Sequence, residues 1–248
     1  MEEEKETGDY RAGIEEKRVF RTIGIKEERI KNSLSDIVKW GKAVSIETIP
    51  NLFGVDIKVI VSSEKETIVS SLMKSIEGSI KKRFGDNIYG MENESLEEVV
   101  MYLFSLRKKT LAIAESCTGG LISHLLTSIP GSSEYYKGGI VAYSNEAKID
   151  ILDISEGMIR RCGAVSADTA KEMAIGVARR LKADVGLSVT GIAGPGGGTE
   201  EKPVGLVYMG VAEEGKSEAK RFFFLGTREK IKEQSAYFSL DMARRKML

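Results

Sequence analysis

Residues 111–120 read Leu-Ala-Ile-Ala-Glu-Ser-Cys-Thr-Gly-Gly, an apolar run that gives way to small and polar residues. A short apolar run bounded by turn residues is typical of a buried strand. The Thr-Gly-Gly that follows can open a helix, because glycine permits a tight turn between the two elements. The stretch therefore predicts a strand over 111–114 that leads into a helix near Thr118, with a polar turn between them.

The alternation of strand and helix patterns continues to the end of the chain. Such alternation is typical of layered α/β domains, in which helices cover a sheet. The sequence therefore predicts an α/β domain over residues 92–248. Its predicted elements are a helix from Ser95 to Leu106, strands at 111–114, 139–143, 185–190, 204–212 and 219–225, a helix over 166–181, and a terminal helix.

Residues 17–91 form a separate pattern, which predicts a smaller α+β domain with a boundary near Gly90. The predicted elements are strands at 19–24, 43–49 and 55–61 and helices at 26–39 and 64–83. Apolar residues of the second helix recur at four-residue spacing, and this pattern predicts that they share one buried face. They are Ile68, Leu72, Ile76 and Ile80.

The composition excludes several classes of protein. The 248 residues include 37 basic and 37 acidic side chains, so no overall charge attracts nucleic acid or an anionic membrane. No apolar stretch approaches the ~18 residues of a membrane span. Two cysteines, Cys117 and Cys162, are too few for a disulfide framework. Residues 1–16 hold seven acidic side chains, so we expect a flexible acidic tail rather than a secretory leader, and a cytoplasmic protein.

The chain also lacks the residues of the common catalytic mechanisms. A nucleophile activated by histidine needs a nearby imidazole, and the single histidine, His124, follows Cys117 by seven residues. On a helix that spacing is roughly 10 Å, too far for a hydrogen bond. The two cysteines have no clustered partners for zinc, and the glycines at 191–198 do not end in the Gly-Lys-Ser/Thr of a phosphate-binding loop. The candidate catalytic groups that remain are serine, lysine and tyrosine side chains and backbone amides.

Strings of small and reactive residues follow the predicted strands, where ligands bind in α/β sheets. They are Ala114-Glu-Ser-Cys-Thr-Gly-Gly120, Pro130-Gly-Ser-Ser133, Ala142-Tyr-Ser-Asn-Glu-Ala-Lys148, Gly163-Ala-Val-Ser166 and Thr190-Gly-Ile-Ala-Gly-Pro-Gly-Gly-Gly-Thr-Glu-Glu-Lys-Pro-Val-Gly205. In this order they resemble the C-terminal domain of the CinA (competence-damage-inducible) family, and residues 17–91 resemble its KH-like domain. The resemblance implies an amide hydrolase that converts nicotinamide mononucleotide to nicotinate mononucleotide and ammonia.

The resemblance also implies a reactive set of three residues. Ser133 is the expected nucleophile, Lys148 is the expected base, and Tyr143 is expected to hydrogen-bond between or beside them. Ser132 and Ser116 are alternatives for the nucleophile. A lysine accepts a proton only when it is neutral, so burial or a cationic neighbour has to lower the pKa of Lys148 from about 10.4.

A second group of residues is expected to bind the substrate. The turn at Thr118 has backbone N–H groups that can hold an anion, although close strand-to-helix packing explains its glycines equally well. Arg228 is the expected phosphate ligand, because a guanidinium can bind phosphate through two hydrogen bonds. The full set that the resemblance implies is Glu115, Ser116, Thr118, Gly119, Gly120, Thr190, Gly191, Gly194, Gly197, Lys202 and Arg228.

No metal ion or organic cofactor is expected, and the expected partners are a pyridine mononucleotide and a second copy of the chain. Longer family members begin with a molybdopterin-binding-like domain that this sequence does not resemble, so its pyrophosphatase activity is not expected. A catalytically silent nucleotide-binding protein is the alternative. Residues 17–91 carry 14 basic and nine acidic side chains, which would suit nucleic-acid binding. However, no two glycines in residues 1–91 have the Gly-x-x-Gly spacing of the loop with which KH domains bind nucleic acid, so this function is not expected.

Overall fold

The computed structural model describes residues 13–38, 43–51 and 53–248. The chain divides into two compact units between Asn93 and Glu94. Each unit contains a β-sheet with helices packed on it. This arrangement confirms the mixed α/β class that the alternation of strand and helix patterns predicts.

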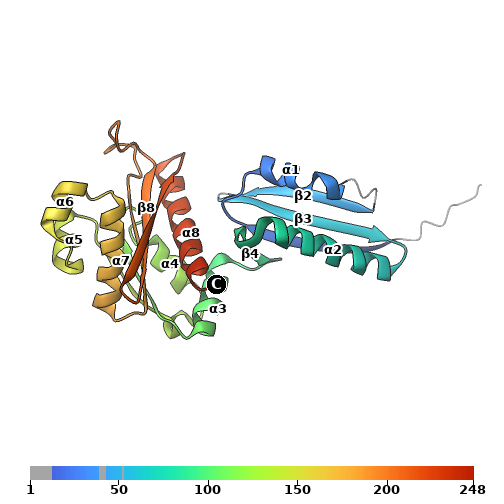
Figure 1. The fold of residues 1–248 in the computed structure, drawn as a ribbon, viewed down its shortest axis with the longest axis horizontal. Helices are drawn as coiled ribbons and strands as arrows, with labels where there is room; N and C mark the ends of the chain where they lie inside the picture. Colours follow the sequence, from blue (N-terminus) through green and yellow to red (C-terminus); the bar gives the residue numbers. More distant parts are fainter. Residues whose placement is uncertain (1–12, 39–42, 52) are drawn as a thin grey trace, which may run out of the picture. The chain divides into compact units, whose positions relative to one another are not determined.

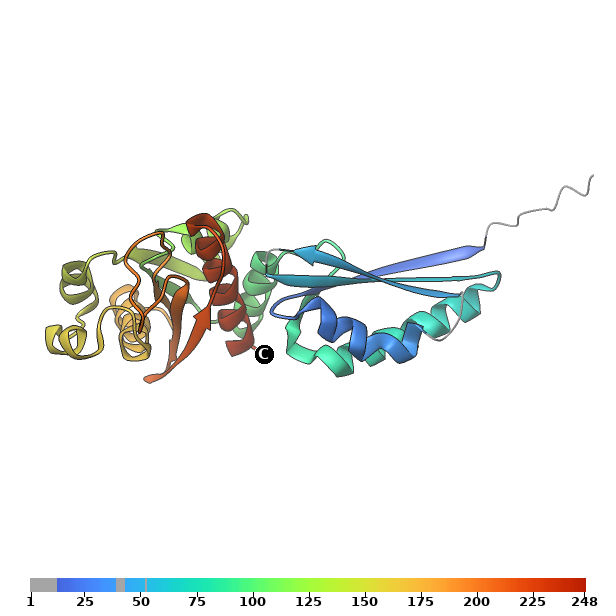
Figure 2. The same ribbon diagram turned by 90° about the horizontal axis from the view of Figure 1, so that it is seen from above.

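The N-terminal unit is a small α+β domain, as the sequence predicts. Its elements are β1 (Ile14–Thr22), α1 (Glu27–Val38), β2 (Val44–Asn51), β3 (Gly54–Ser63), α2 (Glu66–Phe84), the 3-10 helix η1 (Gly85–Asn87) and β4 (Ile88–Met91). The sheet is antiparallel with the order β2-β3-β1-β4, which is the arrangement of a split βαβ fold. Helices α1 and α2 cover one face of this sheet (Figure 2).

Helix α2 buries two of the four expected residues, Ile76 and Ile80, together with residues outside the expected set. Its buried side chains include Val69, Met73, Ile76 and Ile80, whereas Ile68 is 42% exposed. With 3.6 residues per turn, a strict four-residue spacing drifts around the helix by about 40° at each step. The buried stripe includes a three-residue step, from 73 to 76, which returns it toward the sheet.

Part of the expected acidic tail belongs to the sheet. Strand β1 begins at Ile14, which pairs with β3. Acidic residues are tolerated at this end because they stay in contact with water, as Glu15 does while it pairs with Lys17. Residues 1–12 of the expected tail, and Lys39 at the expected end of the first helix, lie outside the described residues.

The C-terminal unit is a three-layer α/β domain. Its elements are α3 (Leu96–Arg107), β5 (Leu111–Glu115), α4 (Leu121–Thr127), the 3-10 helix η2 (Ser132–Glu134), β6 (Tyr136–Val141), α5 (Asn145–Leu152), α6 (Glu156–Cys162), α7 (Ala167–Leu181), β7 (Val185–Gly191), β8 (Leu206–Glu213), β9 (Lys216–Phe223) and α8 (Arg228–Lys246). The sheet order is β6-β5-β7-β8-β9, with β5, β6 and β7 parallel and β8 and β9 antiparallel. Figure 1 shows α5, α6 and α7 on one side of the sheet and α4 and α8 on the other.

The centre of this sheet is as buried as its apolar sequence predicts. Residues 111–114 of β5 are fully buried between β6 and β7. Helix α7 packs directly on β7 at Gly186, where a Cβ atom would lie 1.9 Å from the carbonyl oxygen of Ala174. Because β5 and β7 are parallel neighbours, the residues that follow their C-terminal ends come together at one edge of the sheet.

Two features of this unit differ from the pattern that the sequence predicts. Strand β6 begins at Tyr136, three residues before the expected start, and Tyr143 lies in the loop after it. Helices α5 and α6 are not predicted, because seven or eight residues offer too little periodicity to detect. The start of α5 is marked only by Ser144, whose hydroxyl accepts a hydrogen bond from the backbone N–H of Ala147. None of the described helices is long and apolar enough to cross a membrane.

Candidate functional site

A pocket of about 240 Å³ opens at the C-terminal ends of β5 and β7. Its walls come from the turn after β5, the segment from β6 into α5, the loop before α7, the glycine-rich segment after β7 and the start of α8. The lining residues are Ser116, Cys117, Tyr143, Lys148, Ala164, Val165, Thr190, Gly191, Ile192, Ala193, Gly194, Gly196, Gly197 and Arg228. A second hollow, of about 370 Å³ beside the C-terminal end of α7, has no serine or cysteine among its lining residues.

Lys148 is the buried amine of the pocket. It lies in the first turns of α5, which directs its side chain inward, and it is only 1% exposed. Its Nζ is 3.2 Å from Ser116 Oγ and 2.8 Å and 3.2 Å from the carbonyl oxygens of Ala142 and Tyr143. Burial lowers the pKa of Lys148 below its ordinary value, and the nearby carboxylate of Glu146 opposes that shift. A lysine that accepts a proton as a base requires such a lowered pKa.

Ser116 is the serine that contacts this lysine. It directly follows β5 and is 8% exposed, and its backbone N–H donates to the carbonyl oxygen of Val189 on the neighbouring strand. Cys117 beside it also lines the pocket. Burial, with a smaller effect of the Glu115 carboxylate, raises the pKa of the Cys117 thiol to about 12. At neutral pH Cys117 is therefore a protonated thiol and a poor nucleophile.

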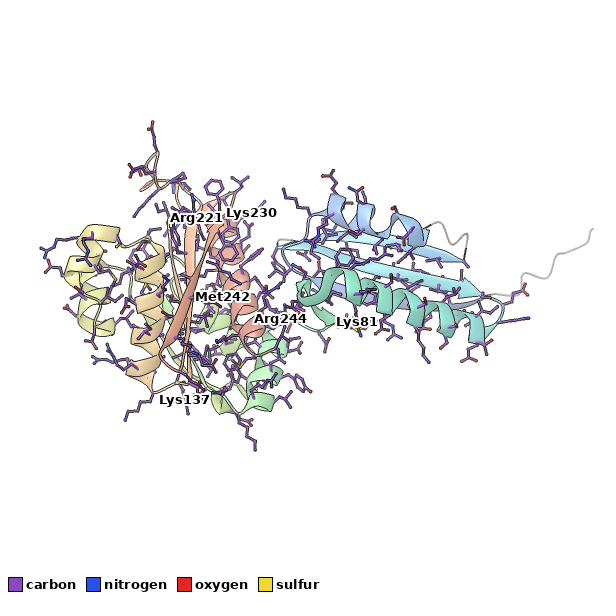
Figure 3. All side chains as sticks on the ribbon, viewed as in Figure 1. Lys81, Lys137, Arg221, Lys230, Met242 and Arg244 are labelled. Atoms are coloured by element: carbon purple, nitrogen blue, oxygen red, sulfur yellow. The ribbon has the colours of Figure 1, made fainter. Side chains whose placement is uncertain are left out.

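The structure does not bring Ser133 to Lys148. Ser133 belongs to η2, which precedes β6, whereas Tyr143 follows the other end of that strand. Six strand residues separate the two ends by about 20 Å. In Figure 3, Lys137 at the start of β6 lies at one end of the unit and Lys230, near the start of α8, at the opposite end. The ten-residue spacing is therefore filled by an extended strand, and Ser116 replaces Ser133 as the candidate nucleophile.

Ser132 fails as an alternative for the same reason, because it is also part of η2. Of the three serines that the sequence offers as the nucleophile, only Ser116 lies beside Lys148. That serine is the one in the turn after β5, where parallel strands end.

Tyr143 and Arg228 form one side of the pocket mouth. The Tyr143 side chain is 61% exposed, and its hydroxyl accepts a hydrogen bond of 3.2 Å from Arg228 Nη2. Arg228 Nη1 donates to the carbonyl oxygen of Gly194 at 2.7 Å. Tyr143 therefore contacts Lys148 through its backbone carbonyl, whereas its hydroxyl points to Arg228. Of the two expected positions, between or beside the nucleophile and the base, Tyr143 takes the one beside Lys148, through its backbone.

At the start of α4, the backbone N–H groups expected to hold an anion are bound by the carboxylate of Glu115. Glu115 is fully buried, and its carboxylate accepts hydrogen bonds from the backbone N–H groups of Gly120, Ile122 and Ser123. Thr118 is fully buried as well. Four residues expected to bind substrate consequently do not line the pocket: Glu115, Thr118, Gly119 and Gly120.

The segment after β7 contributes the other predicted binding residues. Thr190, Gly191, Gly194 and Gly197 line the pocket, and the Thr190 hydroxyl donates to the carbonyl oxygen of Ala164 at 2.8 Å. Gly194 has a φ of 79°, and a Cβ atom there would lie 2.5 Å from a methyl group of Val204, so the close approach requires glycine.

Lys202 lies outside the pocket lining. Its Nζ donates to the carbonyl oxygen of Cys162 at 2.8 Å. The side chain therefore ties the glycine-rich segment to the loop before α7, and its charge is not directed at the substrate space. This corrects its expected role as a substrate ligand.

Sequence reasoning missed several pocket residues that carry no charge. Ala164 and Val165 belong to the quoted string 163–166, so their place in the motif was a usable signal. Cys117, Ile192, Ala193 and Gly196 also line the pocket. Within the described ranges, no group of three or more histidine, cysteine, aspartate or glutamate side chains is placed to hold a metal ion.

Comparison with known proteins places this site in a family. Residues 93–247 match the CinA C-terminal domain, and residues 17–90 match the KH domain of damage-inducible protein CinA. The chain belongs to the CinA family. A CinA-like protein of Dictyoglomus thermophilum is 41% identical over 96% of the chain, and one of Endomicrobium trichonymphae is 40% identical over 96%. The chain spans 58% and 57% of the lengths of these two relatives.

Solved CinA structures share the fold of the C-terminal unit. The competence/damage inducible protein CihA of Agrobacterium tumefaciens has 39% sequence identity and a TM-score of 0.57, covering 59% of this chain and 92% of its own. A CinA superfamily protein of Enterobacter cloacae has 32% identity and a TM-score of 0.60, covering 65% of this chain and 98% of its own. The names of these four proteins state no reaction.

Proposed function

We propose that the protein is an amide hydrolase in which Ser116 is the nucleophile and Lys148 the base. The observation that carries this proposal is the 3.2 Å contact between Lys148 Nζ and Ser116 Oγ in the pocket. A hydroxyl becomes a useful nucleophile when a positioned base takes its proton, and a lysine can replace histidine in that role. The pocket offers a nucleophile and a base that are both buried and in contact.

The surroundings of Lys148 fit a neutral amine. The carbonyl oxygens of Ala142 and Tyr143 accept its two shorter N–H bonds and that of Ser144 lies farther away, at 3.4 Å, so in the neutral amine the lone pair can face the Ser116 hydroxyl. Burial favours this neutral form because it lowers the pKa of the amine. The same carbonyl oxygens stabilise the ammonium that forms when the proton is transferred.

The reaction then proceeds in two halves. Ser116 Oγ attacks the carboxamide carbon while its proton passes to Lys148, and the resulting tetrahedral intermediate collapses as Lys148 returns that proton to the leaving nitrogen. Ammonia departs and an ester on Ser116 remains. Water attacks the ester with Lys148 as base, which releases the carboxylic acid and restores the serine. These steps use water as the only second reactant.

The proposed substrate is nicotinamide mononucleotide, and the product is nicotinate mononucleotide. The resemblance to the CinA deamidase domain supports this choice, and so does a cationic side chain at the pocket mouth. Arg228 is hydrogen-bonded to Gly194 and Tyr143, so its guanidinium is fixed beside the glycine-rich segment, where a phosphate would approach. On the resemblance alone, we further propose a cytoplasmic homodimer, which sedimentation of the purified protein would test.

The first test is product analysis. Purified protein incubated with nicotinamide mononucleotide is expected to release ammonia and nicotinate mononucleotide in equal amounts, with or without a chelator. The riboside, which lacks the phosphate, is expected to react with a higher KM. A folded protein that binds the nucleotide and releases no ammonia would refute the hydrolase and favour the silent binding protein.

A further inference from the structure

We infer that Glu115 is a positioning residue, which anchors the turn from Ser116 to Gly120 and thereby sets Ser116 against Lys148. This inference rests on the proposed function, because it assigns a role within the same reaction. Glu115 does not line the pocket and cannot touch the substrate. Its effect on the reaction has to pass through the turn that carries the nucleophile.

The carboxylate of Glu115 is fully buried and fully occupied. One oxygen accepts from Gly120 N at 2.9 Å and from Ile122 N at 3.2 Å. The other accepts from Ser123 N at 2.9 Å and from Ser123 Oγ at 2.7 Å. A buried carboxylate is tolerated when charge-assisted hydrogen bonds replace its water. Both oxygens are needed, because each serves two donors on the start of α4.

A second layer fixes this cluster from the side of β6. Ser123 Oγ also accepts a 2.7 Å hydrogen bond from the hydroxyl of Tyr136. Burial raises the pKa of Tyr136 to about 12, so the hydroxyl keeps its proton at neutral pH. Gly139 leaves the necessary space, because a Cβ atom there would lie 2.3 Å from Ser123 Oγ and 2.6 Å from the Tyr136 oxygen. Strands β5 and β6 and helix α4 are therefore joined at one buried charge.

The turn held in this way has one unused backbone donor beside the nucleophile in the pocket lining. Cys117 lines the pocket, and among the described residues no other residue accepts a hydrogen bond from its N–H. The N–H of the residue after a nucleophilic serine recurs as an oxyanion donor in hydrolases. The neighbouring N–H groups of the turn cannot help, because Gly119 N binds the carbonyl oxygen of Ser116 and Gly120 N binds Glu115. Anchoring by Glu115 thus sets both the nucleophile and the N–H of Cys117, its candidate oxyanion donor.

The test compares Glu115→Gln with Glu134→Gln in the full chain. Glutamine keeps the size of the side chain, but its amide nitrogen faces two N–H donors that need an acceptor. Glu134 is an exposed residue of η2 and serves as the matched control. We expect Glu115→Gln to lower kcat by about 10- to 100-fold, as misplaced reactive groups do, with KM within about twofold of wild type. The midpoint of the pH profile of kcat should not move, because Lys148 is untouched.

Hydrogen–deuterium exchange of the peptide over 117–126 separates this inference from the proposed reaction. In Glu115→Gln the amides of this peptide are expected to exchange at least tenfold faster than in wild type, and labelling of Ser116 by a fluorophosphonate is expected to slow. Both readouts apply even if nicotinamide mononucleotide is not hydrolysed, since neither uses it. Unchanged exchange and labelling would overturn the positioning role, and so would a raised KM with an unchanged kcat, which would indicate a substrate contact.

A second variant keeps the test decisive if Glu115→Gln does not fold. Tyr136→Phe removes only the outer hydrogen bond to Ser123 and keeps the carboxylate. We expect it to accelerate exchange in the same peptide by about two- to tenfold and to lower kcat by a similar factor, since one neutral hydrogen bond contributes about 0.5–1.5 kcal/mol. Exchange and kcat equal to those of wild type would overturn the inference.

Discussion

Replacing Lys148 with methionine should remove most of the amide hydrolysis while the chain stays folded. Methionine has a similar length and no charge, so it fills the space of a side chain that is 1% exposed. Among the described residues, Lys148 is the only basic side chain that contacts Ser116, and the single histidine, His124, is exposed on α4. The variant therefore has no substitute base for the serine proton.

The size of the loss follows from this lack of a second acceptor. A positioned general base contributes about 10²- to 10⁴-fold, or about 2.7–5.5 kcal/mol. We expect kcat to fall by about 10³- to 10⁴-fold, in the upper part of that range. The carbonyl oxygens of Ala142 and Tyr143 lose a donor, which costs about 1–3 kcal/mol each, and the removal of a buried amine offsets part of that cost. The melting temperature should fall by about 2–8 °C.

The assay is ammonia release from nicotinamide mononucleotide under saturating substrate, with thermal unfolding measured on the same samples. Lys171→Met is the matched control, because Lys171 lies on α7, is partly exposed and pairs with the exposed Asp168. The control should keep wild-type kcat. A folded Lys148→Met variant with more than a tenth of wild-type kcat would refute the assignment of the base.

Three further predictions follow from the same contacts. Because burial lowers the pKa of Lys148 below its ordinary value of 10.5, kcat/KM should rise with pH through that lowered pKa. Between the lowered pKa and 10.5, Lys148 binds a proton more readily in the unfolded chain than in the folded one. The unfolding free energy should therefore also rise with pH over that range, by at most about 1.4 kcal/mol per pH unit, and urea titrations at a series of pH values would measure it. A falling kcat/KM over that range would contradict the neutral amine. Arg228→Lys should raise KM by about 10- to 100-fold with little change in kcat, because lysine cannot reproduce the fork of the guanidinium; an unchanged KM would exclude Arg228 from substrate binding. Gly139→Ala should lower the unfolding free energy by about 1–3 kcal/mol, because its Cβ would overlap Ser123 Oγ, whereas Gly196→Ala, which has open space, should change it by less than about 0.5 kcal/mol.

The sequence predicts the sheet of the C-terminal unit well where strands are wholly apolar. The strand over 111–114 and the helix over 166–181 agree with β5 and α7, because a buried run and a long amphipathic pattern each leave a strong signal. The pocket is also placed correctly at the ends of β5 and β7. Lys148 and Thr190 of the quoted strings line it, and so does Arg228, which lies outside those strings.

The choice of nucleophile shows what spacing alone cannot provide. Ser133 is closer to Lys148 in sequence than Ser116 is, but a strand carries the chain across the whole sheet between them. Ser116 is 32 residues from Lys148 and yet in contact with it, because β5 and β6 are parallel neighbours whose ends coincide. Only the strand order of the sheet contains that information.

Some polar residues of the motifs point into the pocket, whereas others bind backbone groups of the chain. Glu115 and Lys202 carry the charges expected to meet a substrate, yet both are used to hold backbone groups of the chain. A sequence does not reveal whether a charged side chain faces a pocket or a neighbouring backbone donor or acceptor. Hydrogen-bond partners decide this, and they appear only once the strands are placed.

The central claim is that Ser116, and not Ser133, is the nucleophile of an amide hydrolase. The most direct measurement compares ammonia release from nicotinamide mononucleotide by wild type, Ser116→Ala and Ser133→Ala, with melting temperatures recorded for all three. The account predicts that Ser116→Ala loses at least about 10³-fold in kcat and that Ser133→Ala keeps wild-type activity. A folded Ser116→Ala variant with wild-type activity, or loss of activity in Ser133→Ala alone, would contradict it.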